Sequence, residues 1–391
     1  MSDLKRRETF LPFCPPDVSQ MELDEVADTI RSGWWAKGKR TIAFEQAFAQ
    51  RVGATYAVAL NSATAALHLS LVASGIGPGD EVITTPYTFC ASANTILHVG
   101  ATPVFVDVDP DTACIDPQRV EAAITPRTKA IVPVHYAGMA CDLDALYGIA
   151  ARHGLFVSED AAHAVETTYN GRFIGCSVPG AASFSFYATK NLATGEGGML
   201  VTEDEALAQR ARVLSCHGMD ANAWNRYAKG GTWRYDVEVP GYKYNMFDIQ
   251  AALGLVQLQR MPQMQAARMQ RVAVYDQAFA DMPELVLQRN PPYSGHSKHL
   301  YVLRLAPGAL RIDRDHFIEE LSARNVSTSV HFIPVHLMRA YRAMGYCEGD
   351  FPNAEAFFQQ EISLPMYSTL SMADAHYVVD AVRDIVETYR A

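Results

Sequence analysis

The sequence predicts an α/β fold: a mostly parallel central sheet with helices on both faces, followed by a smaller C-terminal α+β domain. Seven apolar runs alternate with helix-like segments between residues 55 and 202, which is the pattern of a parallel sheet. The runs are apolar almost throughout, as expected for strands buried on both faces. From about residue 205 the alternation stops. We therefore expect a large domain over residues 1–255 and a small domain over residues 256–391.

The first element of the large domain is a helix expected over residues 19–33. Ser19 and Glu22 have the S-x-x-E spacing of a capping box. Apolar residues then recur at helical spacing: Leu23, Val26, Ala27 and Ile30. Gly33 is a suitable stop for this helix.

The alternating region follows. The apolar runs predict strands at 55–60, 81–85, 103–108, 130–135, 155–159, 182–187 and 198–202. The segments between most of them predict helices at 64–74, 88–98, 117–124 and 142–153. Turn signals such as GPGD at 77–80 separate these elements.

The second half of the chain has a different pattern. Residues 217–245 form a long polar and aromatic stretch without periodicity, which is typical of a functional or interface loop. A helix is expected over 248–261, kinked or ended by Pro262. The remaining expected elements are a helix near 267–281, a strand at 301–306 and helices at 315–324 and 372–389.

Composition excludes several classes of function. The formal net charge is −10 and no Lys/Arg-rich run occurs, so nucleic acids and anionic membranes are disfavoured as partners. No apolar run is long enough to span a bilayer, and we expect no secretory leader. The seven scattered cysteines contain no C-x-x-C, which favours reduced thiols in the cytoplasm. We expect no metal site, because His331 and His336 lack helix-face spacing.

The segment EDAAHA at 159–164 follows the predicted strand 155–159. Ligands of open α/β sheets bind at the carboxyl ends of strands, where Asp160 lies. Its ordinary roles would be to cap a helix or to pair with a cation. Alternatively, a buried carboxylate here could hold a proton on the ring nitrogen of pyridoxal phosphate. His163 lies one helical turn further on and could contact the same ring.

Lys190 is the natural complement to Asp160. Most lysines lie at the surface, but this one follows the apolar run SFSFYAT and precedes a glycine-rich segment. In a pocket of low polarity a lysine has a lowered pKa and can attack an aldehyde as the free amine. Lys190 could therefore bind the aldehyde of the same cofactor.

A phosphate and an aromatic ring would need further partners. NSATAALHLSL at 61–71 places small hydroxyl residues before a helix, where backbone amides could bind an anion. Taken alone, however, this segment favours helix capping by Ser62 or Thr64. Ser185 could reach the same phosphate. Phe89 follows the strand 81–85 and could stack on a flat cofactor or simply belong to the core.

These segments together resemble the DegT/DnrJ/EryC1/StrS family of pyridoxal-phosphate sugar aminotransferases. The resemblance rests on LNSATAALHLSL, PYTFCASAN, EDAAHA, SFSFYATKNLATGEGGML, PGYKYNMFDIQAALGLVQL and the segment 331–367, and runs from about residue 10 to the end. It implies a fold-type I aminotransferase, usually a homodimer with shared active sites.

The resemblance also implies roles for individual residues. Lys190 matches the Schiff-base lysine, Asp160 the partner of the ring nitrogen, and His163 a contact near the cofactor's 3-hydroxyl. The matching cofactor contacts are Phe89 for stacking and Ala63, Thr64 and Ser185 for the phosphate; Asn245 matches a contact to the neighbouring subunit's cofactor, and His331 a contact to a sugar-nucleotide substrate.

We therefore expect transfer of an amino group from L-glutamate, which becomes 2-oxoglutarate, to a nucleotide-linked 4-keto-6-deoxyhexose. A 3-keto substrate, or a lyase or aldolase reaction on the same cofactor, stays open. Relatives that act as dehydratases have histidine in place of the lysine, so Lys190 favours amination. A nicotinamide enzyme is disfavoured because no G-x-G-x-x-G follows a strand, and a non-catalytic scaffold because the Lys190/Asp160 pair is intact.

Overall fold

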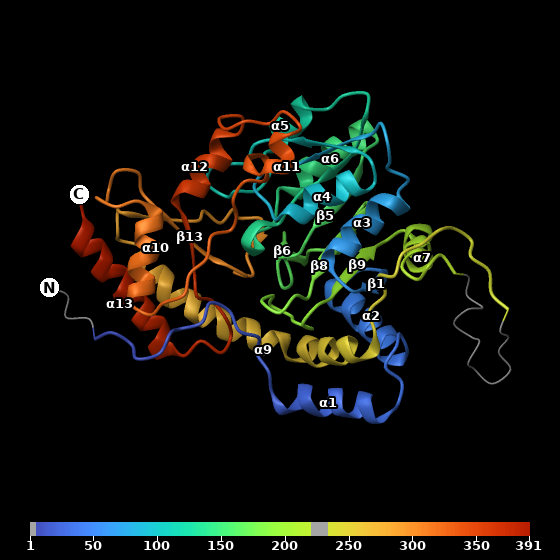
Figure 1. Cartoon of the computed structure of the whole chain (residues 1–391), viewed down its shortest axis with the longest axis horizontal. Helices are drawn as coiled ribbons and strands as arrows, with labels where there is room; N and C mark the ends of the chain where they lie inside the picture. The colour runs from blue at the N-terminus through green and yellow to red at the C-terminus, as the bar shows by residue number, and fades with distance from the viewer. Residues whose placement is uncertain (1–4, 220–233) are drawn as a thin grey trace.

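The large central sheet has seven strands. The computed structural model describes residues 5–219 and 234–391. The strands are β1 (Tyr56–Leu60), β2 (Glu81–Thr84), β3 (Thr102–Phe105), β4 (Thr128–Val132), β5 (Phe156–Asp160), β8 (Ala181–Ser185) and β9 (Gly198–Thr202). Their order is β1-β9-β8-β5-β4-β2-β3, and β9 runs antiparallel to both neighbours (Figure 1). The sheet is therefore mostly parallel, as predicted.

Helices cover both faces of this sheet. α3 (Ala63–Ala73), α4 (Cys90–His98) and α7 (Glu205–Leu214) pack on one face, where Val58 and Leu200 are buried. α2 (Lys39–Val52), α6 (Leu143–His153) and α9 (Asp248–Phe279) pack on the other, against Ala57 and Val201. Neighbouring strand residues point to opposite faces, so strands that are apolar throughout supply both cores. The short helix α5 (Pro117–Ala122) follows β3.

The C-terminal part contains a second sheet, with the order β10 (Leu285–Leu287), β12 (Tyr301–Leu305) and β13 (Glu361–Leu364). α10 (Arg314–Ala323) and α13 (Met372–Tyr389) share a separate core with it, while α11 (Arg339–Arg342) and α12 (Pro352–Gln360) lie nearer the large sheet. A small sheet joins the halves by pairing β11 (Ser294–Gly295) with the hairpin β6 (Thr168–Tyr169) and β7 (Arg172–Phe173). The predicted boundary between residues 255 and 256 falls inside α9, and the two-domain division stays a prediction.

One helix passes through Pro262, so the prediction of a second, separate helix near 267–281 is wrong. α9 continues for 32 residues, as the long helix at the bottom of Figure 1. Proline removes one backbone donor and crowds the preceding turn. Here Pro262 is exposed, and buried residues on both sides of it hold the helix.

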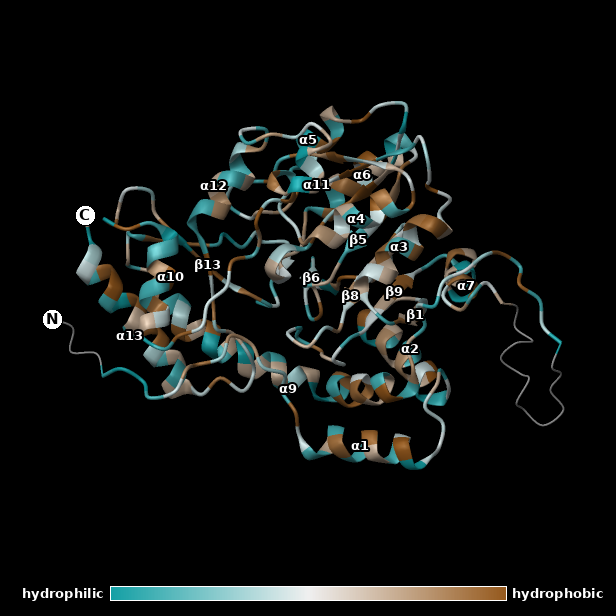
Figure 2. Ribbon diagram, in the orientation of Figure 1, coloured by the Kyte–Doolittle hydropathy of each residue, from teal (hydrophilic) through white to brown (hydrophobic). Residues whose placement is uncertain are grey.

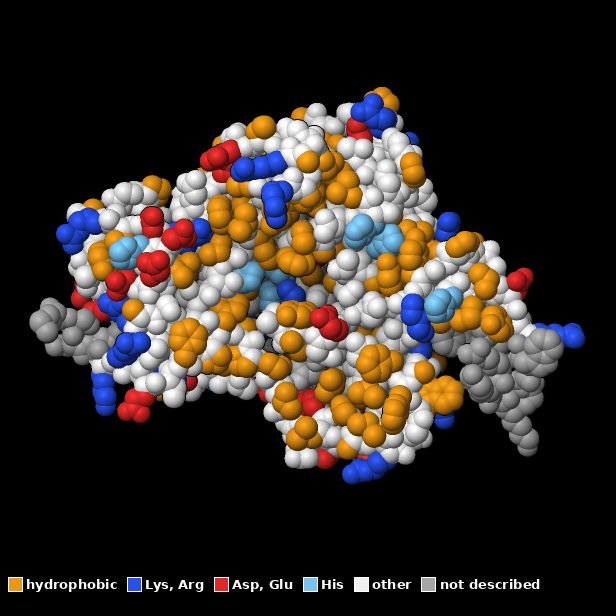
Figure 3. All heavy atoms as spheres, viewed as in Figure 1, with side chains coloured by type: hydrophobic (Ala, Val, Ile, Leu, Met, Phe, Trp, Pro, Cys, Tyr) orange, Lys and Arg blue, Asp and Glu red, His pale blue; other side chains and the backbone are white. Residues whose placement is uncertain are grey.

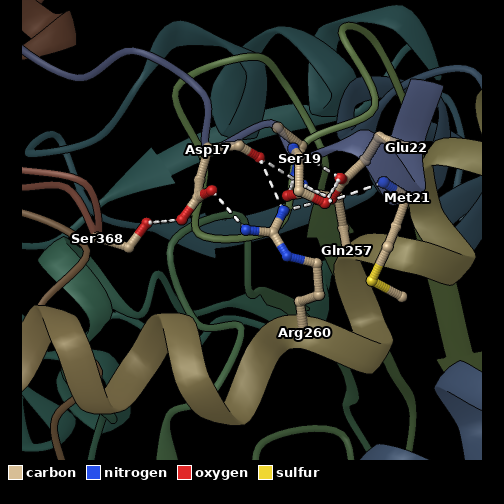
Figure 4. A network of polar contacts seen from close by, with 8 residues as sticks. Asp17, Ser19, Met21, Glu22, Gln257, Arg260 and Ser368 are labelled. Atoms are coloured by element: carbon tan, nitrogen blue, oxygen red, sulfur yellow. Dashed lines mark hydrogen bonds and ion pairs between the residues drawn. The ribbon is translucent and has the colours of Figure 1, made fainter.

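Helix α1 (Gln20–Arg31) has the predicted capping box, but it packs through polar side chains. Arg260 of α9 donates to Glu22 and Asp17, and Gln257 donates to Glu22 at 2.8 Å (Figure 4). The apolar stripe is exposed instead: Leu23 is 58% and Ile30 47% accessible. Figure 2 shows this brown stripe on α1. The outer face of α1 is therefore an apolar surface that no described residue of this chain covers.

Most other predicted elements lie within a few residues of their predicted positions. The elements that were not predicted are α2, α7, β10, α11, α12, β13 and the small sheet. Two single-turn 3-10 helices, η1 (Tyr136–Gly138) and η2 (Val335–Leu337), complete the elements named here. Of the aperiodic stretch 217–245, residues 220–233 lie outside the described residues. No helix in the described ranges has both the length and the hydrophobicity needed to cross a membrane.

Candidate active site

A cavity of about 460 Å³ opens at the carboxyl ends of β5 and β8. Eight of the nine residues predicted for the site line it: Ala63, Thr64, Phe89, Asp160, His163, Ser185, Lys190 and His331. In Figure 3 basic and histidine side chains lie in a hollow bordered by apolar groups near the middle of the view. Parallel strands end at the same edge of a sheet, and for this reason residues far apart in the chain meet here.

Asp160 is the last residue of β5, and its carboxylate is buried in the cavity wall. Ser92 Oγ donates to Oδ2 at 2.7 Å, and the amide of Ala162 donates to Oδ1 at 3.1 Å. Burial raises the pKa of Asp160 above its ordinary value, while these hydrogen bonds and the charge of Lys190 oppose the rise. Such a carboxylate favours a cationic or N–H-bearing partner in the cavity.

Lys190 lies in the turn after β8, where its amide donates to the Tyr187 carbonyl at 2.8 Å. Burial lowers the pKa of Lys190 from 10.5 to about 8, against the attraction of Asp160 and Cys14. A minor fraction of this amine is therefore already unprotonated near neutral pH and can act as a nucleophile or base. The side chain lines the cavity and is partly exposed there.

His163 is held as a neutral imidazole beside Lys190. The amide of Ala137 donates to its Nδ1 at 3.2 Å, which places the ring proton on Nε2. Burial, with the charge of Lys190, keeps the pKa of His163 well below its ordinary value. Its ring lies 4.5 Å from that of His299 and stacks on Phe332 at 5.7 Å between centroids.

The start of α3 forms the opposite wall. Ser62 caps the helix by accepting from the amide of Ala65 at 3.1 Å. The first amides of a helix have no helical acceptor, so those of Ala63 and Thr64 remain for an anion. A Cβ on Gly198 would lie 2.3 Å from the Ser62 carbonyl carbon, so only glycine lets β9 lie against this turn. Ser62 therefore has the capping role that the sequence left open.

Phe89 and Ser185 complete the wall. Ser185 Oγ accepts from the Tyr187 amide at 3.3 Å and keeps its own hydrogen for a ligand. Phe89 is 58% exposed and lies 6.0 Å from the Phe332 ring, so it is not a core residue in the isolated chain. Both side chains could contact a flat, anionic ligand.

His331 enters the cavity from the C-terminal part of the chain. Its Nδ1 lies 2.9 Å from Ser363 Oγ, and its amide donates to Glu361 Oε2 at 2.9 Å. The hydroxyl of Tyr136 donates to its carbonyl at 2.6 Å, and its ring stacks on Phe13. His331 is thus fixed from four directions.

Asn245 is the predicted residue that lies outside this cavity. Its backbone bridges to Leu60, and its Oδ1 accepts from Lys243 Nζ at 2.6 Å. Nothing about this position contradicts the expected contact to a neighbouring subunit. Within the described ranges no group of three or more His, Cys, Asp or Glu is placed to hold a metal ion.

Sequence reasoning missed Ser92, His299 and Phe332. Ser92 lies three residues after Phe89 on α4, a spacing that could have suggested it. His299, which contacts Lys190, and Phe332, which lines the cavity, have no local signal, since both come from distant loops. A second, more open hollow of about 750 Å³ around Gln265 and Lys298 contains neither Lys190 nor Asp160.

Comparison with known proteins gives concordant matches. The model of the DegT/DnrJ/EryC1/StrS aminotransferase family matches residues 16–383. The spore coat polysaccharide biosynthesis protein SpsC of Bacillus subtilis is 54% identical over 98% of this chain and 99% of its own. Spr1654 from Streptococcus pneumoniae, a candidate sugar aminotransferase solved in its PLP form, has a TM-score of 0.90 at 37% identity, covering 97% of this chain and 99% of that one. Helicobacter pylori PseC, an aminotransferase involved in pseudoaminic acid biosynthesis, has a TM-score of 0.90 at 30% identity, covering 97% and 100%.

Proposed function

Because the chain belongs to the DegT/DnrJ/EryC1/StrS aminotransferase family, we propose that it moves an amino group from L-glutamate to a nucleotide-linked 4-keto-6-deoxyhexose. Membership supports a sugar aminotransferase of fold type I with pyridoxal 5′-phosphate as cofactor. The observation that carries the proposal is that Lys190 and the buried carboxylate of Asp160 line one cavity. The donor, the nucleotide and the aminated carbon are parts of the proposal.

The cavity fits this cofactor at three points. The amides of Ala63 and Thr64, with Ser185 Oγ, would bind the phosphate. Gly198 has no side chain and so leaves space beside these amides. Asp160 would accept from the protonated ring nitrogen. Lys190 would supply the amine that bonds to the aldehyde.

When bound, pyridoxal phosphate draws electrons from the carbon that carries the amino group. Asp160 would hold the ring proton on which this withdrawal depends. The free amine of Lys190 would carry the proton from that carbon to the C4′ carbon of the cofactor. The neutral His163 would donate from Nε2 and orient the ring.

The substrate class rests on relatives and on His331. SpsC and PseC are named for polysaccharide and pseudoaminic acid biosynthesis, which supports an amino sugar made for a glycan. His331 would contact the sugar nucleotide. A 3-keto sugar is the alternative acceptor, and a lyase reaction on the same cofactor the alternative chemistry.

The protein would act as a homodimer in the cytoplasm. The exposed apolar face of α1, extended by Trp34 and Trp35, supports a subunit interface. Asn245 lies outside its own cavity and would contact the partner's cofactor. The seven cysteines are free thiols, as in a reducing compartment.

Purified holoprotein mixed with L-glutamate and then with UDP-, dTDP- and GDP-linked keto sugars tests this function. We expect glutamate to replace the cofactor's visible absorbance with that of its amine form, and one keto sugar to restore it. NMR of the product identifies the aminated carbon. An unchanged spectrum with glutamate and other amino acids would exclude a transaminase.

A further inference from the structure

Three side chains, one lining the cavity and two buried behind it, form an unbroken chain of hydrogen bonds. Glu361 Oε1 lies 2.5 Å from Ser363 Oγ, and Ser363 Oγ lies 2.9 Å from His331 Nδ1. Glu361 and Ser363 are fully buried on β13, and His331 lines the cavity. The other ring nitrogen of His331, Nε2, has no hydrogen-bond partner among the described residues, which leaves it for a ligand.

We propose that Glu361 and Ser363 are positioning residues that decide which ring nitrogen of His331 carries the proton. His331 would then present either an acceptor or a donor to the ligand at Nε2. The consequence for a bound sugar nucleotide rests on the proposed function. The chain of hydrogen bonds from Glu361 through Ser363 to His331, called the relay below, does not.

The direction of each hydrogen bond follows from the donors available. Glu361 Oε2 accepts the amide hydrogen of His331, so a proton on Glu361 must sit on Oε1. If Glu361 is ionised, Ser363 donates to Oε1, and its oxygen can then accept only from a protonated Nδ1. The lone pair of His331 then lies on Nε2.

If Glu361 is protonated, every bond in the chain reverses. Oε1–H donates to Ser363 Oγ, and the serine hydrogen turns to Nδ1 as its remaining acceptor. The ring proton of a neutral His331 then lies on Nε2. One proton gained by Glu361 thus changes the polarity of His331 without charging the imidazole.

The surroundings allow Glu361 to gain this proton in an accessible pH range. Burial raises the pKa of Glu361 to about 8, against hydrogen bonds from Ser363 and the His331 amide and the charge of Arg314. The charge of Arg314 is paired with Asp315 at 2.6 Å. The other groups around Glu361 are Arg304, its register partner on β12, and the buried phenols of Tyr87 and Tyr136.

His331 itself stays neutral across the same range, since burial lowers its pKa to about 4. Below about pH 8 the protein would therefore present an N–H to its ligand, and above it a lone pair. At neutral pH His331 would suit an acceptor oxygen of the substrate, such as a carbonyl or phosphate oxygen, rather than a hydroxyl donor.

The test is ¹⁵N NMR of holoprotein labelled at histidine, from pH 6 to pH 10, with His331 assigned from His331→Gln. We expect Nε2 to move from the range of a protonated nitrogen to that of a bare one as the pH rises through about 8, with Nδ1 moving oppositely. Glu361→Gln should keep the Nε2–H form at every pH, because the amide NH₂ donates to Ser363 permanently.

Ser363→Ala removes the middle of the chain and should uncouple His331 from Glu361. Ser329→Ala is the matched control, because Ser329 pairs with Ser363 through backbone hydrogen bonds and should leave the titration intact. The relay is wrong if His331 follows the same titration in Glu361→Gln or Ser363→Ala, or if both nitrogens gain protons together. The experiment needs no turnover, so a failure of the proposed function would be seen separately.

Discussion

The amine of Lys190 lies 3.5 Å from Nε2 of His299, at the outer limit of a hydrogen bond. His299 donates from Nδ1 to Asn191 Oδ1 at 3.1 Å, so its Nε2 carries the lone pair that faces Lys190. Burial, with the charge of Lys190, holds the pKa of His299 well below its ordinary value. The amine is therefore oriented by a neutral acceptor, and its pKa is lowered by burial.

Replacing His299 should misplace the amine without removing it. In His299→Asn we expect kcat to fall by about 10- to 100-fold with a smaller change in KM, because orientation rather than binding is lost. His296→Asn, in the same loop but facing the second hollow, is the control. Equal activity of the two variants would mean that His299 does not orient Lys190.

Lys190→Ala should lose both the covalent attachment of the cofactor and the mobile base. We expect activity to fall by roughly 10²- to 10⁴-fold and the visible absorbance of the holoprotein to vanish. Lys129→Ala, an exposed lysine on β4, should behave as wild type. If Lys190→Ala retains the visible absorbance band, the cofactor is attached to another residue.

Asp160→Asn should keep the shape of the site but lose the charge that holds the ring proton. We expect kcat to fall on the order of 10²-fold, the size typical for loss of one electrostatic partner. Cofactor affinity, measured by titration of the apoprotein, should also weaken. Asp281→Asn, at the surface, is the control variant. If the two variants have the same kcat, Asp160 has no role in the mechanism.

The contact between α1 and α9 should make stability depend on acid pH. Burial alone would raise the pKa of Glu22, but hydrogen bonds from Ser19, Arg260 and Gln257 lower it to about 2. Because the pKa of Glu22 is lower in the folded protein than the unfolded value of 4.5, its ionised form stabilises the fold above pH 4.5. This stabilisation is lost as the pH falls towards 2.

We expect Glu22→Gln to reduce the free energy of unfolding by about 2–3 kcal/mol at pH 7 and to lessen its decline between pH 4.5 and pH 2. Denaturant unfolding at several pH values measures both effects. Asp24→Asn, exposed on the same helix, should change neither. An unchanged acid profile in Glu22→Gln would show that Glu22 is not the group that titrates.

Local sequence determined much of the fold and the centre of the candidate site. Strand and helix patterns between residues 55 and 202 predicted the elements near their observed positions, because burial on both faces requires strands that are apolar throughout. Asp160 and Lys190 could be paired in advance because both follow strands of one sheet, and β5 and β8 are parallel neighbours. Because parallel strands end at the same edge of a sheet, residues that follow them lie close together.

Tertiary structure decided what local pattern cannot encode. α9 passes through Pro262 because packing on both sides outweighs one lost hydrogen bond. α1 turns its polar side inward because Arg260 and Gln257, more than two hundred residues away, offer partners to Glu22. His299 and Glu361 reach the site from distant segments of the chain, and their contacts depend on side-chain geometry that no spacing in the sequence records.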